Sequence, residues 1–131
     1  MKHILPLVLT LFATPLWAAD PMSAEEFEAY TTGKTLFFGQ DGQAYGAEKY
    51  LKNRRVLWSF LDGQCQEGTW YQVGSEICFD YDGGTGPQCW IFKQSAGGLI
   101  AEFRGDNEIS ELYEAQDLDE EMVCLGPEVG V

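Results

Sequence analysis

Residues 65–93 have the sequence CQEGTWYQVGSEICFDYDGGTGPQCWIFK, which alternates between strand-like segments and turn signals. Aromatic and β-branched residues alternate with polar ones in each segment, as is typical of strands with one buried face. The segments are residues 65–73, 77–81 and 89–93. Gly-Ser at 74–75 and Asp-Gly-Gly-Thr at 82–85 are short, glycine-containing connections of the kind that join antiparallel neighbours. This stretch therefore predicts two successive β-hairpins.

The same stretch predicts which side chains face the core. If Trp70 lies opposite Ile77, then Ile77 and Phe79 share the face of Trp70, and the second hairpin extends that face to Trp90 and Phe92. This aromatic face is the expected core, and the cysteines fall on the opposite, more polar face.

The segments that flank this stretch continue the same pattern. Further strand-like segments are residues 35–38, 43–45, 56–61, 99–104 and 109–113, with a less regular one around Tyr50. Their connections are too short for crossover helices. We therefore predict an all-β fold: an antiparallel meander of seven or eight strands that closes into a small barrel or a curved sandwich. One short helix should precede it, because residues 23–26 (SAEE) form a capping box and Gly33 provides a stop.

The first 19 residues have the features of a secretory signal peptide. A basic start is followed by an apolar run over residues 4–16 and by small residues at 18–19. Removal of this segment would leave one domain, residues 20–131, with a net charge of -14 in place of -13, and would remove His3, the only histidine. We expect a secreted or periplasmic, acidic protein.

The domain contains four cysteines, which in an exported protein indicate two disulfide bonds. Three pairings are possible. A hairpin centred on residues 82–85 places Cys78 opposite Cys89, which would leave Cys65 to pair with Cys124. A four-thiolate metal site is the alternative, but the sequence has no C-x-x-C pair. We expect no metal and no cofactor.

The absence of histidine from residues 20–131 excludes the usual histidine-dependent enzymes. Hydrolysis by paired carboxylates remains as an alternative, but no motif among the 21 acidic residues selects a pair. We assign no catalytic residue and expect a binding protein. Trp58 and Tyr71 are the candidate ligand-contacting aromatics.

Charge is unevenly distributed along the chain. A basic patch of Lys49, Lys52, Arg54 and Arg55 contrasts with residues 102–128, which contain ten acidic residues and one basic residue. The patch could pair with the protein's own acidic segment or bind an anionic group. The overall acidity argues against nucleic acid and anionic lipid as partners, and we expect no membrane insertion.

Several short motifs resemble an uncharacterised family of small secreted or periplasmic proteobacterial proteins of unknown function. They are GKTL at 33–36, YG at 45–46, RVLWSF at 55–60, GTWY at 68–71, ICF at 77–79, CWIF at 89–92 and CLGP at 124–127. The resemblance implies secretion and a compact domain, and it implies no catalytic residues.

Together these features predict a non-catalytic binding domain. One hypothesis is capture of a cationic protein, by analogy with small disulfide-bonded barrels that inhibit lysozyme. The alternative hypothesis is a small-molecule or sugar binder in a barrel mouth, and a carboxylate-based hydrolase comes third.

Overall fold

The computed structural model describes residue 10 and residues 19–105, 110–115 and 121–125. The expected signal peptide and much of the acidic segment 102–128 therefore lie outside the described residues. The elements are α1 Ala24–Thr31, β1 Thr35–Gln40, β2 Gln43–Tyr50, η1 Lys52–Arg54, β3 Arg55–Ser59, β4 Cys65–Val73, β5 Glu76–Tyr81, β6 Gln88–Ser95, β7 Gly98–Phe103 and β8 Glu111–Glu114. No helix in the described part of the chain is long and apolar enough to cross a membrane.

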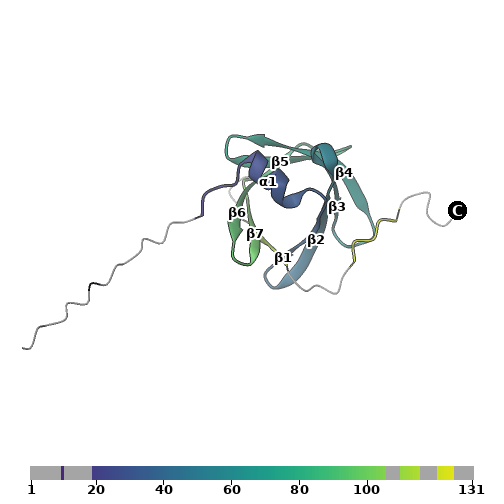
Figure 1. The fold of residues 1–131 in the computed structure, drawn as a ribbon. Helices are drawn as coiled ribbons and strands as arrows, with labels where there is room; N and C mark the ends of the chain where they lie inside the picture. The colour runs from purple at the N-terminus through teal and green to yellow at the C-terminus, as the bar shows by residue number, and fades with distance from the viewer. Residues whose placement is uncertain (1–9, 11–18, 106–109, 116–120, 126–131) are drawn as a thin grey trace, which may run out of the picture.

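The strands form a closed antiparallel barrel. Each strand pairs with the next along the chain, and β8 pairs with β1 through Tyr113 and Glu114 to close the sheet. Figure 1 shows the strands in a ring, with α1 lying across one end. The all-β meander with one short helix is confirmed, and the barrel is the form it takes. The two segments expected at 43–45 and around Tyr50 are one continuous strand, β2.

The central hairpins differ from the sequence prediction in register but not in facing. Trp70 lies opposite Phe79, not opposite Ile77, because the connection between β4 and β5 contains only Gly74 and Ser75. Side chains alternate with a period of two, so this shift of two residues leaves the same face inward. Trp70, Ile77 and Phe79 are accordingly all buried.

The helix forms the base of the barrel interior. Phe27 is completely buried, with its ring centroid 4.5 Å from that of Phe92, 5.0 Å from that of Trp70 and 5.6 Å from that of Tyr50. These side chains fill the end of the barrel that α1 covers. The opposite end of the barrel is open.

A capping box starts α1, as the sequence predicts. The Ser23 hydroxyl accepts a hydrogen bond from the Glu26 N–H at 3.2 Å, and the Ser23 N–H donates to Glu26 Oε1 at 3.4 Å. Both contacts satisfy N–H groups that have no partner within the helix.

Replacement of Ser23 by Ala should therefore lower the free energy of unfolding by about 1 kcal/mol. The matched variant Ser75→Ala, in the exposed β4–β5 turn, should change it by less than about 0.5 kcal/mol. Urea unfolding followed by tryptophan fluorescence measures both. Equal effects of the two substitutions would show that the cap contributes nothing specific.

Two disulfide bonds reinforce the barrel. Cys78 lies directly opposite Cys89 in the β5–β6 pair and is bonded to it, while Cys65 is bonded to Cys124, 59 residues away. The pairing expected from the sequence is confirmed. Next to the second bond, the Leu125 N–H donates to the Gly63 carbonyl at 2.7 Å, so the segment around Cys124 is held against the β3–β4 connection.

Candidate functional site

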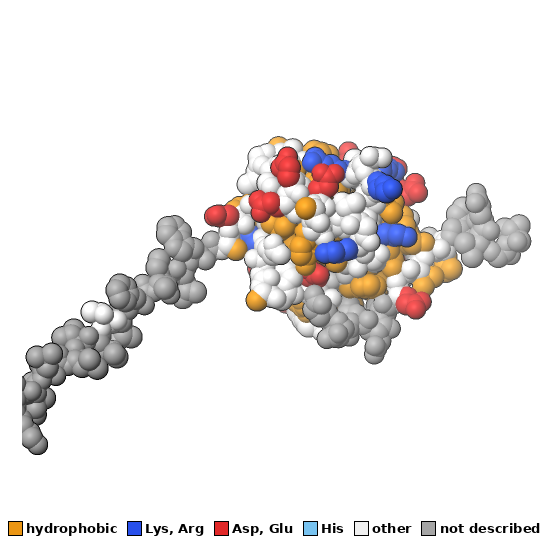
Figure 2. All heavy atoms as spheres, in the orientation of Figure 1, with side chains coloured by type: hydrophobic (Ala, Val, Ile, Leu, Met, Phe, Trp, Pro, Cys, Tyr) orange, Lys and Arg blue, Asp and Glu red, His pale blue; other side chains and the backbone are white. Residues whose placement is uncertain are grey.

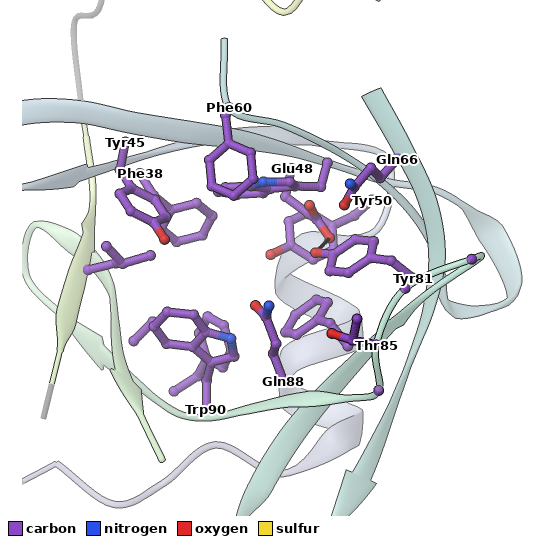
Figure 3. Close-up of a pocket in the computed structure, with 18 residues that line it drawn as sticks. Phe38, Tyr45, Glu48, Tyr50, Phe60, Gln66, Tyr81, Thr85, Gln88 and Trp90 are labelled. Atoms are coloured by element: carbon purple, nitrogen blue, oxygen red, sulfur yellow. Dashed lines mark hydrogen bonds between the residues drawn. The ribbon is translucent and has the colours of Figure 1, made fainter. Parts of the chain in front are cut away.

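A cavity of about 400 Å³ occupies the end of the barrel opposite α1 (Figure 3). Side chains from all eight strands reach it, together with the connections that follow β3 and β5. The lining residues are Phe38, Tyr45, Glu48, Tyr50, Trp58, Phe60, Gln66, Phe79, Tyr81, Gly83, Gly84, Thr85, Gly86, Gln88, Trp90, Phe92, Ala101 and Leu112. A volume of this size accommodates a small organic ligand.

Three aromatic residues form one side of the cavity mouth, and we call them the mouth cluster. The ring centroids of Tyr45, Trp58 and Phe60 lie 5.3 to 5.9 Å from one another. Gly46 makes this arrangement possible, since a Cβ atom there would overlap the Trp58 ring. Phe60 is 54% exposed although it belongs to this cluster. On this side the cavity presents an aromatic rim to the solvent, whereas the exposed lining residues elsewhere include Gln66, Thr85 and Gln88.

Glu48 is the one acidic residue among the described lining residues and is almost completely buried, with 1% of its surface exposed. Its Oε1 atom accepts a hydrogen bond from the Tyr81 hydroxyl at 2.9 Å, which Figure 3 shows as a dashed line. Among the described residues, its Oε2 atom has no hydrogen-bond partner. Burial raises the pKa of Glu48 from 4.5 to about 8, although the Tyr81 hydrogen bond opposes this shift. An unpaired buried carboxyl is costly for stability and therefore suggests a role in binding.

The tyrosines near Glu48 also have perturbed acidities. Burial raises the pKa of both Tyr50 and Tyr81 well above the usual value, and the nearby Glu48 carboxyl raises both further. Both hydroxyls therefore stay protonated in the neutral pH range. They serve as uncharged hydrogen-bonding groups at the inner end of the cavity.

The cavity lining has an unusual set of ionisable side chains for a site that contains a buried carboxyl. The lining residues that the structure describes include no lysine, arginine or histidine, so none of them can neutralise an ionised Glu48. In the described part of the chain the lining also has a single carboxyl group, whereas hydrolysis by paired carboxylates requires two.

The two aromatic residues singled out from the sequence lie in different places. Trp58 lines the cavity, whereas Tyr71 is an exposed residue that does not line it. Trp70, which the facing argument placed in the core, is packed against Phe27, and Trp90, placed there by the same argument, lines the cavity.

The four residues of the basic patch do not line the cavity, although they are close in sequence to residues that do, and its two arginines form contacts within the chain. Arg54 Nη2 lies 3.3 Å from Glu28 Oε2, and Arg55 Nη2 lies 2.9 Å from Asp82 Oδ2. Arg54 also lies over the Trp70 ring, at 4.6 Å. Lys49 and Lys52 are exposed. These arginines pair with acids of this chain, although in the described residues the acids belong to α1, β4 and the β5–β6 connection, outside residues 102–128.

Charge on the outer surface is mixed. Figure 2 shows acidic and basic side chains together on the face that carries α1. In the part of the chain described, the cluster closest to a metal-binding geometry is Glu76, Cys78 and Cys89, but the two sulfurs are joined in a disulfide and are not thiolate ligands.

Glu48 is the site residue that sequence reasoning missed. The sequence signal was present: on a continuous strand, Glu48 lies two residues before the apolar Tyr50 and therefore on the same face. The prediction of two separate segments, 43–45 and around Tyr50, hid this relation.

No family model, curated protein or solved structure matches the chain. The geometry of the cavity is therefore the basis for the function proposed for this protein.

Proposed function

We propose that this protein is a non-catalytic binding domain that encloses a small, largely apolar ligand inside the barrel. The observation that carries the proposal is the cavity of about 400 Å³, with aromatic rings on one side of its mouth and the buried Glu48 carboxyl among its polar groups. This combination of apolar walls and a few polar groups is typical of small-molecule sites.

The position of the cavity supports the same function. α1 and the packed residues around Phe27 close one end of the barrel, so a ligand would enter through the mouth cluster. The half-buried rings at the mouth offer apolar contact that the closed end cannot offer. The disulfide bond between Cys78 and Cys89 ties together β5 and β6, which both contribute lining residues.

A neutral fluorescent probe tests ligand binding directly. N-phenyl-1-naphthylamine, whose nitrogen is uncharged at neutral pH, should increase in fluorescence when it enters the cavity. Ala101 is buried and lines the cavity, so Ala101→Phe should occupy part of the volume and weaken probe binding by at least about tenfold. The matched variant Ala96→Phe, in an exposed turn, should bind as the wild type does. Equal binding by the two variants would place the probe outside the barrel.

Capture of a cationic protein is supported only by the net charge of -13. The described surface shows basic residues among the acidic ones, which does not favour a uniformly acidic docking face. Binding to a basic protein such as lysozyme at low salt, with loss at high salt, would favour that function over the cavity.

The disulfide bonds fit an oxidising compartment. Together with the signal-peptide features of residues 1–19, they support our proposal that the protein acts in the periplasm or after secretion.

A further inference from the structure

The charge of the cavity lining restricts the class of ligand. Among the described residues that line the cavity, Glu48 is the only charged one, and no basic side chain accompanies it. An anionic ligand would meet a carboxyl group and no compensating cation. A cationic ligand would supply the positive charge that the protein itself does not place there.

The hydrogen-bonding pattern at Glu48 fits one donor from outside the protein. Oε1 already accepts from the Tyr81 hydroxyl, and Oε2 has no partner among the described residues. The hydroxyl oxygens of Tyr50 and Tyr81 lie on the same side of the cavity as Glu48 in Figure 3. A protonated amine has several N–H donors, so it could bond to Oε2 and to a neighbouring hydroxyl oxygen at once.

The aromatic walls suit the same kind of ligand. The faces of tryptophan and tyrosine rings attract cations, most strongly where water is excluded. Trp58 and Tyr45 lie beside the mouth, and Phe79 and Tyr81 stack on each other further along the lining with an interplanar angle of 13°. A ligand with an apolar or aromatic body would fill the space between these rings.

From the position of the Glu48 carboxyl among these aromatic rings, we propose that the ligand is an apolar or aromatic amine whose ammonium group binds Glu48 inside the barrel. The inference rests on the proposed function and specifies its ligand class.

Binding of such an amine should be linked to the protonation of Glu48. The groups that face Glu48 are Tyr81 on β5 and Tyr50 on β2, while the residues paired with it on β1 and β3 are Leu36 and Trp58. Since the pKa of Glu48 is raised to about 8, its carboxyl is mainly protonated at pH 7 and would release a proton when an ammonium group arrives. Amine affinity should therefore rise between pH 5.5 and 7.5, by up to about tenfold for each pH unit.

A matched ligand series tests the inference. The bound N-phenyl-1-naphthylamine is displaced from the disulfide-bonded protein by 1-naphthylmethylamine, 1-naphthylmethanol or 1-naphthoate, which differ only in the polar group. We expect the amine to compete at least about tenfold better than the alcohol at pH 7.5, and the carboxylate to compete least. Calorimetry in two buffers of different ionisation enthalpy should show release of a proton only with the amine.

The variant Glu48→Gln keeps the shape and an oxygen that accepts from Tyr81, but removes the charge. It should lose the preference for the amine and its pH dependence, yet still bind the neutral probe. Glu111→Gln removes an exposed carboxyl on β8 and should leave the preference for the amine and its pH dependence unchanged. Two results would contradict the amine inference while the cavity still binds ligands. In the first, the probe binds but the amine competes no better than the alcohol; in the second, the amine keeps its advantage over the alcohol in Glu48→Gln. If the probe does not bind inside the barrel, the proposed function fails and the inference fails with it.

Discussion

The stability of the wild-type protein should fall by about 4 kcal/mol between pH 5 and pH 9, and the variant Glu48→Gln should lose this pH dependence. The pKa of Glu48 is about 8 in the folded protein and near 4.5 when the residue is solvated. The folded state therefore binds more protons than the unfolded state across this interval, and stability decreases as the pH rises. Each pH unit between the two pKa values contributes about 1.4 kcal/mol, which gives the expected size.

The other groups with shifted pKa values titrate outside this pH interval, so the measurement reports mainly on Glu48. The only histidine is His3, in the segment expected to be removed. The tyrosines with raised pKa values titrate above this interval, and Asp82, whose pKa is lowered by its bond to Arg55, titrates below it.

Urea unfolding at pH 5, 6, 7, 8 and 9, followed by tryptophan fluorescence, measures the effect. At pH 9 Glu48→Gln should be more stable than the wild type by several kcal/mol, because it no longer places an unpaired charge in the barrel. Glu111→Gln serves as the control for loss of an exposed charge and should follow the wild-type curve. A wild-type stability that does not change with pH would contradict the burial of an uncharged Glu48.

Much of the fold could be predicted because its determinants are local. Strands joined by tight glycine-containing turns pair antiparallel with their neighbours along the chain, which predicts an antiparallel meander. The hairpin between Cys78 and Cys89 even predicted a disulfide bond, since residues opposite each other in a hairpin have a fixed relation in sequence. The Trp70–Ile77 pairing was wrong by two residues, because it places the centre of the turn at residues 73–74, whereas the hairpin is centred on Gly74 and Ser75.

The cavity depends on long-range arrangement, which local patterns do not describe. Alternation predicts that Trp70 and Trp90 face inward, but it cannot tell a packed interior from an open one. The difference arises from α1, which inserts Phe27 beside Trp70 at one end and leaves the rings around Trp58 without such a partner. Closure of β1 onto β8, which completes the cavity wall, joins segments more than 70 residues apart.

Replacement of Phe27 by Ala should destabilise the protein by about 4 kcal/mol, the second large effect that we expect. The side chain is completely buried, and its ring contacts those of Tyr50, Trp70, Phe79 and Phe92. Removal of a buried phenylalanine loses its transfer free energy and leaves a cavity that a closed barrel fills poorly, which together cost about 3 to 5 kcal/mol. Urea unfolding at pH 5, where Glu48 is protonated in the folded state, measures this loss separately from the titration of Glu48.

Phe60→Ala is the matched control, because it makes the same chemical change at the other end of the barrel. Phe60 is 54% exposed, so its removal should lower the stability by less than about 1 kcal/mol. In the ligand assay the order should reverse: Phe60→Ala removes part of the mouth cluster and should weaken binding of the neutral probe, while folded Phe27→Ala should still bind it. Similar losses of stability for both variants would mean that α1 does not close the barrel as a packed base. Because one end supplies stability and the other supplies contact with a ligand, opposite responses of these two phenylalanines would separate the two roles experimentally.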